Sequence, residues 1–159
     1  MIKIMKTALV SIGAVALFTT SAVAGNRGVG VSVTGDTATI RGDIMIQENL
    51  RLEPYFGMTY RSVDVGNTTI SNTTFNLGTA AHMIKEISPA MSMYYGGFLG
   101  FTSDDPANGS SFNLGPVAGV EYAFDPQFTL GAEVSFNMNF GDTTVVSTDS
   151  AVILRYYFD

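Results

Sequence analysis

The sequence has no cysteine and few basic side chains: lysine and arginine together number 8, against 14 aspartates and glutamates. Without cysteine there are no disulfides, so an exported chain of this kind needs another source of stability. Lys85 is the only lysine after residue 24. Soluble domains of this size expose many lysines, so the composition indicates little ordinary water-exposed surface. Nucleic-acid binding is not expected either, because it requires clustered lysine and arginine.

Long apolar runs are confined to the N-terminus. Two lysines precede an apolar run over residues 8–18, and Ala22-Val23-Ala24 has the small-x-small pattern of a cleavage site. The run is too short to cross a bilayer as a helix, which disfavours a membrane-anchoring helix. The sequence therefore predicts a cleaved signal peptide over residues 1–24 and one domain over residues 25–159.

Beyond this segment, large apolar residues recur at every second position in eight stretches. A period of two is that of a β-strand with one apolar face. The predicted strands are residues 27–33, 37–46, 50–61, 74–83, 91–102, 112–124, 128–140 and 150–159. Gly35-Asp36 is a two-residue hairpin signal. The other predicted turns and loops are residues 47–49, 64–73, 84–89, 104–111, 125–127 and 141–149. Pro54 lacks a donor for the ladder, so we expect a bulge or a local break there.

The last strand has the clearest pattern. Val152, Leu154, Tyr156 and Phe158 share one face, and Arg155 lies on the other. An apolar face opposite a charged one indicates a transmembrane barrel, with lipid outside and charge inside. The strand resembles the C-terminal strand of bacterial outer-membrane proteins. That resemblance implies that the four apolar residues are the signal for the barrel-assembly machinery, although Asp159 here follows the final aromatic.

Alternation alone also fits a water-soluble barrel with an apolar interior, such as a lipocalin. Two features favour the membrane instead. The aromatic residues of the apolar face gather at strand ends, as in the two girdles of a membrane barrel. The opposite face is rich in glycine, serine, asparagine and threonine, which suit a narrow interior. The predicted fold class is all-β, an eight-stranded antiparallel up-and-down transmembrane β-barrel.

Three segments carry a resemblance to a known family. They are L-R-L-E-P at 50–54, L-G-P-V-A-G-V-E-Y at 114–122 and L-R-Y-Y-F at 154–158. With them the chain resembles the small eight-stranded outer-membrane barrels: the transmembrane domain of outer membrane protein A, outer membrane protein X, and the opacity- and porin-family barrel domains. The resemblance implies a monomer in the outer membrane of a Gram-negative bacterium, surrounded by lipid and lipopolysaccharide and without a cofactor.

Inward positions of the predicted strands collect charge. They are Arg41, Asp43, Arg51, Glu53, Arg61, Glu121, Glu133 and Arg155. An isolated ion in so narrow an interior costs several kcal/mol unless it is paired, and arginine pairs well with carboxylates. We therefore predict a lumenal ion-pair network. Its members are Arg41, Asp43, Arg51, Glu53, Glu121, Glu133 and Arg155. Two roles stay open: filling and neutralising the barrel, or gating a narrow path.

An enzyme is disfavoured, because catalysis needs a base beside a nucleophile. The one histidine, His82, is predicted to face inward without an apparent partner, and no metal-ligand spacing occurs. We expect no catalytic residue and no metal, and a structural or small porin-like role. The alternative is adhesion, host interaction or resistance through external loops, which look short for an adhesin. Loop acids are candidates for sharing divalent cations with lipopolysaccharide phosphates. They are Asp36, Asp64, Asp104, Asp105, Asp142 and Asp149.

Overall fold

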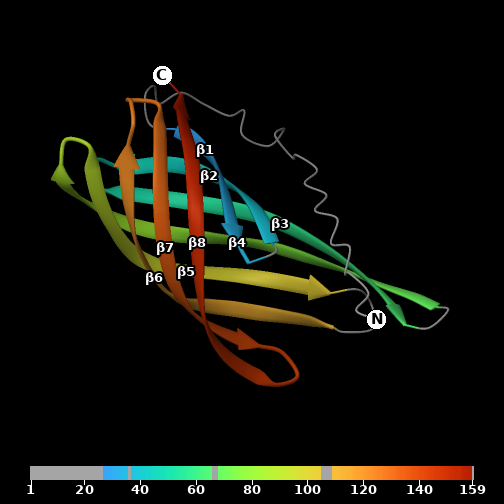
Figure 1. Ribbon diagram of the computed structural model, residues 1–159. Helices are drawn as coiled ribbons and strands as arrows, with labels where there is room; N and C mark the ends of the chain where they lie inside the picture. Colours follow the sequence, from blue (N-terminus) through green and yellow to red (C-terminus); the bar gives the residue numbers. More distant parts are fainter. Residues whose placement is uncertain (1–26, 36, 66–67, 105–108, 159) are drawn as a thin grey trace.

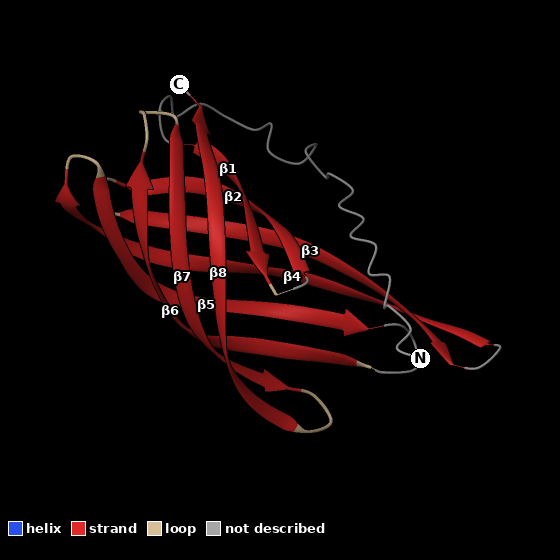
Figure 2. Cartoon of the chain, in the orientation of Figure 1, coloured by secondary structure: helices blue, strands red, loops and turns tan. Residues whose placement is uncertain are grey.

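The computed structural model describes residues 27–35, 37–65, 68–104 and 109–158, and these form one closed, antiparallel β-barrel (Figure 1, Figure 2). The strands are β1 (Arg27–Thr34), β2 (Thr37–Gln47), β3 (Leu50–Val65), β4 (Thr68–Ser88), β5 (Met91–Asp104), β6 (Ser110–Ala123), β7 (Phe128–Phe140) and β8 (Thr144–Phe158). Each strand pairs with the next, and β8 pairs with β1. The predicted eight-stranded up-and-down barrel is confirmed. The predicted signal peptide, residues 1–24, lies outside the described residues.

Within the part of the chain that the structure describes, no helix is long and apolar enough to cross a membrane.

The two rims of the barrel differ in their connections. Arg27 pairs with Phe158, so the first and last strands meet at one rim, which we call the terminal rim. The turns after β2, β4 and β6 lie on this rim, because successive strands run antiparallel. The turns after β1, β3, β5 and β7 lie on the opposite rim. Gly35, in the β1–β2 turn, has a φ of 58°, the left-handed conformation that a two-residue hairpin turn requires.

The opposite rim is uneven because the strands differ in length. β1 and β2 have 8 and 11 residues, whereas β3 and β4 have 16 and 21. β2 reaches β3 only as far as the pair Ala38 and Met58, but β3 and β4 stay paired out to Val65 and Thr68. The end of the β3–β4 hairpin is therefore a two-stranded ribbon that extends beyond the barrel wall, at the right of Figure 1.

Several predicted loop boundaries are wrong for the same reason. Most of the loop expected over 64–73 is strand, β4 continues to Ser88 through the expected turn over 84–89, and β8 begins at Thr144 inside the expected loop over 141–149. The external segments, which were expected to be short, are therefore longer than predicted. In each of these stretches the strand pairs with one neighbour only and has no regular apolar alternation, so its sequence resembles that of a loop.

Pro54 interrupts one hydrogen-bonding ladder without displacing it. The β2–β3 pairing passes from Arg41–Tyr55 to Ile44–Leu52 in unchanged register, while Pro54 still lies opposite Thr79 of β4. This is the local break expected of a residue that lacks an N–H. Pro116 behaves alike: it lies opposite Gly97 of β5, and the ladder to β7 skips its position.

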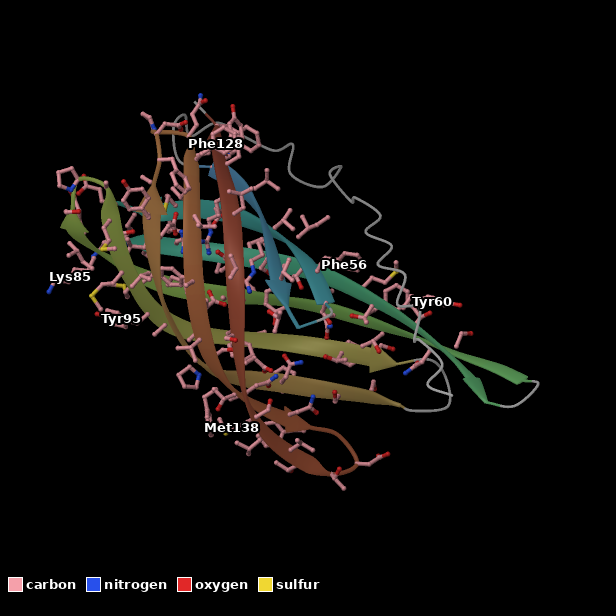
Figure 3. All side chains as sticks on the ribbon, in the orientation of Figure 1. Phe56, Tyr60, Lys85, Tyr95, Phe128 and Met138 are labelled. Carbon is pink, nitrogen blue, oxygen red and sulfur yellow. The ribbon has the colours of Figure 1, made fainter. Side chains whose placement is uncertain are left out.

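The apolar face points outward. On β8, Leu154 is 51% exposed while its neighbours Ile153 and Arg155 are each 0% exposed. The labelled side chains of Tyr95, Lys85 and Met138 project away from the barrel in Figure 3. The apolar residues expected on the outer face form the exposed surface around the wall. This arrangement rules out the water-soluble alternative, which requires the apolar face to line the interior.

Candidate functional site

Arg155 lies at the centre of the lumen and uses every nitrogen of its guanidinium group. Its Nε donates to Asp43 Oδ1 at 3.0 Å, its Nη1 to Glu121 Oε2 at 3.0 Å and its Nη2 to Glu53 Oε2 at 2.7 Å. β8 positions Arg155 inward because Leu154 and Tyr156 on either side take the outer face. One planar fork thus joins carboxylates from β2, β3 and β6, a geometry that suits arginine and not lysine.

Two further arginines extend these contacts across the barrel. Arg41 Nη1 donates to Glu53 Oε1 at 2.6 Å and lies 3.1 Å from Glu133 Oε1, while its Nε donates to Ser32 at 2.8 Å. Arg51 Nη1 donates to Glu121 Oε2 at 2.9 Å. Together these contacts bring the seven residues of the predicted network into one group, which we call the ion-pair cluster. Its members are Arg41, Asp43, Arg51, Glu53, Glu121, Glu133 and Arg155.

Other lumenal residues, which were not predicted from the sequence, complete the cluster. Tyr94 is 1% exposed, donates to Glu133 Oε2 at 3.0 Å, and has its ring 4.9 Å from the Arg51 guanidinium. Tyr157 lies between Arg51 and Glu121, at 2.9 and 3.0 Å. Thr129 donates to Glu121 Oε1 at 2.6 Å. The alternation of each strand shows that these residues face the lumen. It does not show which lumenal residues of different strands lie at the same height in the barrel.

The cluster blocks the lumen. Arg51, Glu53 and Arg155 are each 0–1% exposed, so water reaches them from neither rim. The three arginines face four carboxylates, and nearly every charge has a partner of opposite sign. Pairing is what makes burial of so many ions tolerable, since removing one partner of a buried pair leaves an uncompensated charge. The side chain of Arg61 lies outside the described residues.

A polar cavity lies between the cluster and the uneven rim. We call it the vestibule; it has a volume of about 570 Å³. Arg41 and Glu133 contribute to its lining at the cluster, and Thr34, Gly35 and Ser150 at the low part of the rim, beside the short β1–β2 hairpin. Most of the remaining lining is hydroxyl and amide side chains. The vestibule is therefore closed at the cluster and open at the rim opposite the chain ends.

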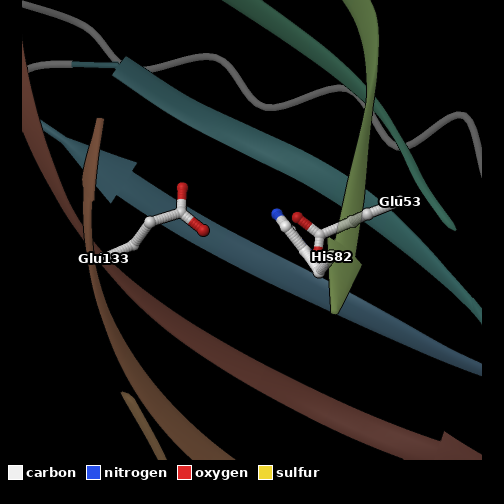
Figure 4. A group of neighbouring side chains, drawn as sticks. All are labelled: Glu53, His82 and Glu133. Atoms are coloured by element: carbon white, nitrogen blue, oxygen red, sulfur yellow. The ribbon is translucent and has the colours of Figure 1, made fainter. Parts of the chain in front are cut away.

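Glu53, His82 and Glu133 lie close enough for one ligand atom from each to fall within 4.8 Å of the others (Figure 4). His82 is 0% exposed and packs on the Tyr94 ring at 4.9 Å. The carboxylate oxygens are already engaged: Glu53 accepts from Arg41 and Arg155, and Glu133 accepts from Arg41 and Tyr94. A cation here would be surrounded by guanidinium groups, so these contacts do not favour a metal centre.

The predicted assembly residues lie on the outer face of β8. Val152, Leu154 and Phe158 are about half exposed, and Tyr156 packs against Phe128 and Phe158 with ring centroids 4.9 and 5.4 Å apart. These aromatic rings belong to a band at the terminal rim. Of the predicted loop acids, the side chains of Asp142 and Asp149 are described; those of Asp64 and Asp104 are not, and Asp36 and Asp105 lie outside the described residues.

No protein-family model matches the sequence, and no curated protein matches it. Solved structures do share its fold. Neisserial surface protein A has a TM-score of 0.59 at 18% identity, covering 84% of this chain and 94% of its own. The N-terminal β-barrel domain of Pseudomonas aeruginosa OprF has a TM-score of 0.54 at 14% identity, with 84% and 96% covered. Yersinia pestis outer membrane protein Ail has a TM-score of 0.51 at 16% identity, with 84% and 99% covered.

These similarities establish the fold. The chain has the architecture of the small eight-stranded barrels of bacterial outer membranes, as the sequence resemblance implied. At such low identities they carry the fold alone, so the role of the lumen rests on the geometry of this chain.

Proposed function

We propose that the protein is an integral β-barrel of the outer membrane of a Gram-negative bacterium, with a lumen that the ion-pair cluster plugs. The observation that carries this proposal is the combination of an outward apolar surface with a charge-paired cluster whose central residues, Arg51, Glu53 and Arg155, are buried. Water would not stabilise such an exterior, and lipid does. The role is structural or that of a small porin-like protein, without catalysis.

The orientation and the surroundings belong to the same proposal. Outer-membrane barrels place short turns and chain ends on the periplasmic side and longer segments outside. The terminal rim would then be periplasmic, and the vestibule would open outward. Residues 1–24 would direct export, and Val152, Leu154, Tyr156 and Phe158 would engage the barrel-assembly machinery. The barrel would lie as a monomer among lipid and lipopolysaccharide.

Single-channel conductance of the refolded mature chain in a planar bilayer tests the plug. We expect little or no current from the unmodified chain, because the cluster spans the lumen. Arg155→Ala and Glu133→Ala should each produce discrete openings of larger conductance, since each removes side-chain volume and unbalances its partners. Asp142→Asn, in the exposed β7–β8 turn, is the matched control and should be silent. Large openings in the unmodified chain would make the lumen an open pore and refute the plug.

A second candidate function is contact with a host surface, and the protruding β3–β4 ribbon favours it. This ribbon carries paired strands out to Val65 and Thr68 with no neighbouring strand on the β2 side. An exposed strand edge can pair with an extended segment of another protein. Replacing residues 62–71 by Asn-Gly should abolish adherence of expressing bacteria to host cells if this function holds. Unchanged adherence, or none in the unmodified strain, would eliminate it.

A further inference from the structure

We infer that the vestibule is a binding site for a small, neutral, polyhydroxylated molecule of the size of a mono- or disaccharide. This goes beyond the plugged-barrel role, since a plug needs no shaped chamber lined mainly by hydroxyl and amide groups on one side. The volume of about 570 Å³ falls within the range of about 300–1,000 Å³ usual for ligand pockets. Because the cluster closes the inner end, a molecule that enters is held and not passed on.

The walls have the chemistry that sugar hydroxyls require. Hydroxyl and carboxamide groups converge on the cavity from several strands. Among them are Thr39, Asn76, Asn113, Ser135, Asn137 and Ser150. Each of these groups both donates and accepts hydrogen bonds. A ligand that presents only donors or only acceptors would leave half of this capacity unused, whereas each sugar hydroxyl does both.

Part of this capacity is arranged in advance. Asn113 Nδ2 donates to Thr102 Oγ1 at 2.9 Å, and Thr102 Oγ1 donates to Asn76 Oδ1 at 2.6 Å, which fixes both amides.

An aromatic ring lies flat against the wall of the same chamber. Tyr55 is opposite Gly78 of β4, and Gly78 is opposite Gly100 of β5. A Cβ at Gly78 would collide with the Tyr55 ring and one at Gly100 with the Tyr55 hydroxyl, so the two glycines provide the space in which this side chain lies. The ring therefore lines the vestibule without filling it. The apolar C–H face of a sugar can stack on such a ring while its hydroxyls reach the amides.

The charges favour a neutral ligand. Arg41 is paired with Glu53 and Glu133, so its charge is already compensated at the inner end of the cavity. Asp149 is the remaining charged residue of the lining, near the mouth. No basic side chain in the described lining is unpaired, as an anionic ligand would require. Asp149 lies opposite Ser135 in the β7–β8 ladder, so the described lining holds one acid besides Glu133 and no unpaired base, and it does not favour an anionic ligand.

Equilibrium binding tests this inference, with the mature chain folded in nanodiscs or in a phosphocholine detergent. Sugar-headed detergents must be avoided because they would compete. We expect sucrose, as the probe, to bind saturably by calorimetry and by saturation-transfer NMR. Ser135→Phe puts a large side chain into the vestibule and should weaken binding about tenfold or more. Val134→Phe, its neighbour on the outer face, is the matched control and should bind within about twofold of the unmodified chain.

Each contrary result overturns the inference. Lack of saturable sucrose binding removes the site, and equal weakening by the two phenylalanine variants removes its location. Lysine or glucose 6-phosphate binding about tenfold tighter than sucrose would show that the ligand class is wrong. Circular dichroism must show both variants folded; should Ser135→Phe misfold, Asn113→Leu replaces it. Because the assay needs neither a conductance nor a defined orientation, its failure is distinguishable from failure of the plug.

Discussion

Glu53 is the carboxylate on which two guanidinium groups converge, one at each oxygen, at 2.6 and 2.7 Å. It is 0% exposed, so no water replaces a lost contact. Glu53→Gln keeps the shape but removes the charge that balances Arg41 and Arg155. We expect the free energy of unfolding to fall by about 3–5 kcal/mol, the usual cost of breaking a buried pair. Urea titration in lipid vesicles measures it. Asp142→Asn, in solvent, should change the value by less than about 0.5 kcal/mol; equal effects would mean that the lumenal pairing contributes nothing.

At the scale of the strand, β8 crosses two environments. Leu154 is 51% exposed on the wall of the barrel, and Val145 is 54% exposed on the part of β8 that extends past its pairing with β1. If lipid surrounds the wall, Leu154→Arg should lower the unfolding free energy by about 2–4 kcal/mol and Val145→Arg by about 0–1 kcal/mol. Unfolding titrations in lipid vesicles compare the two. Equal, small effects would show that β8 meets water along its whole length.

The strands could be predicted from the sequence where lipid meets one face, and not beyond it. β7 has the predicted bounds, Phe128–Phe140, because apolar and polar residues alternate along all of it. The end of β3 was missed because its apolar residues change from even positions (Tyr60) to odd ones (Val63 and Val65), and the start of β4 because residues 68–73 are mostly polar. Alternation of apolar and polar residues shows that the two faces of a strand have different surroundings, and it does not depend on hydrogen bonding. It therefore does not predict the parts of a strand whose two faces have the same surroundings.

At the scale of the whole molecule, the end of the β3–β4 ribbon has no neighbouring strand on either side, so we expect it to contribute little to the unfolding free energy of the barrel. Replacing residues 62–71 by Asn-Gly removes a two-stranded extension, and two strands alone are marginally stable. We expect the unfolding free energy of the barrel to change by less than about 1 kcal/mol. Urea titration of the shortened chain checks this. A large loss of stability would mean that the ribbon supports the wall, and the adherence experiment could then not separate binding from folding.

The ion-pair cluster was predictable in membership but not in pairing. Inward parity and the cost of buried charge select its residues from the sequence. The pairs themselves depend on the stagger of eight strands, which brings Arg41 within 3.1 Å of Glu133 although 92 residues separate them. Tyr94 and Tyr157 were left out because an inward tyrosine is ordinary until the register places it beside an arginine.

The closed ring and the ion-pair cluster also order events in time. The contacts of Arg155 join β8 to β2, β3 and β6, and those of Arg41 join β2 to β3 and β7. Arg41 and Glu53 lie on neighbouring strands and can pair in an open sheet. Arg155 reaches Asp43 and Glu53 only when β8 meets β1 along the stretch from Arg27–Phe158 to Val33–Val152. Closing the ring and completing the charge pairing of its interior are thus one step of folding.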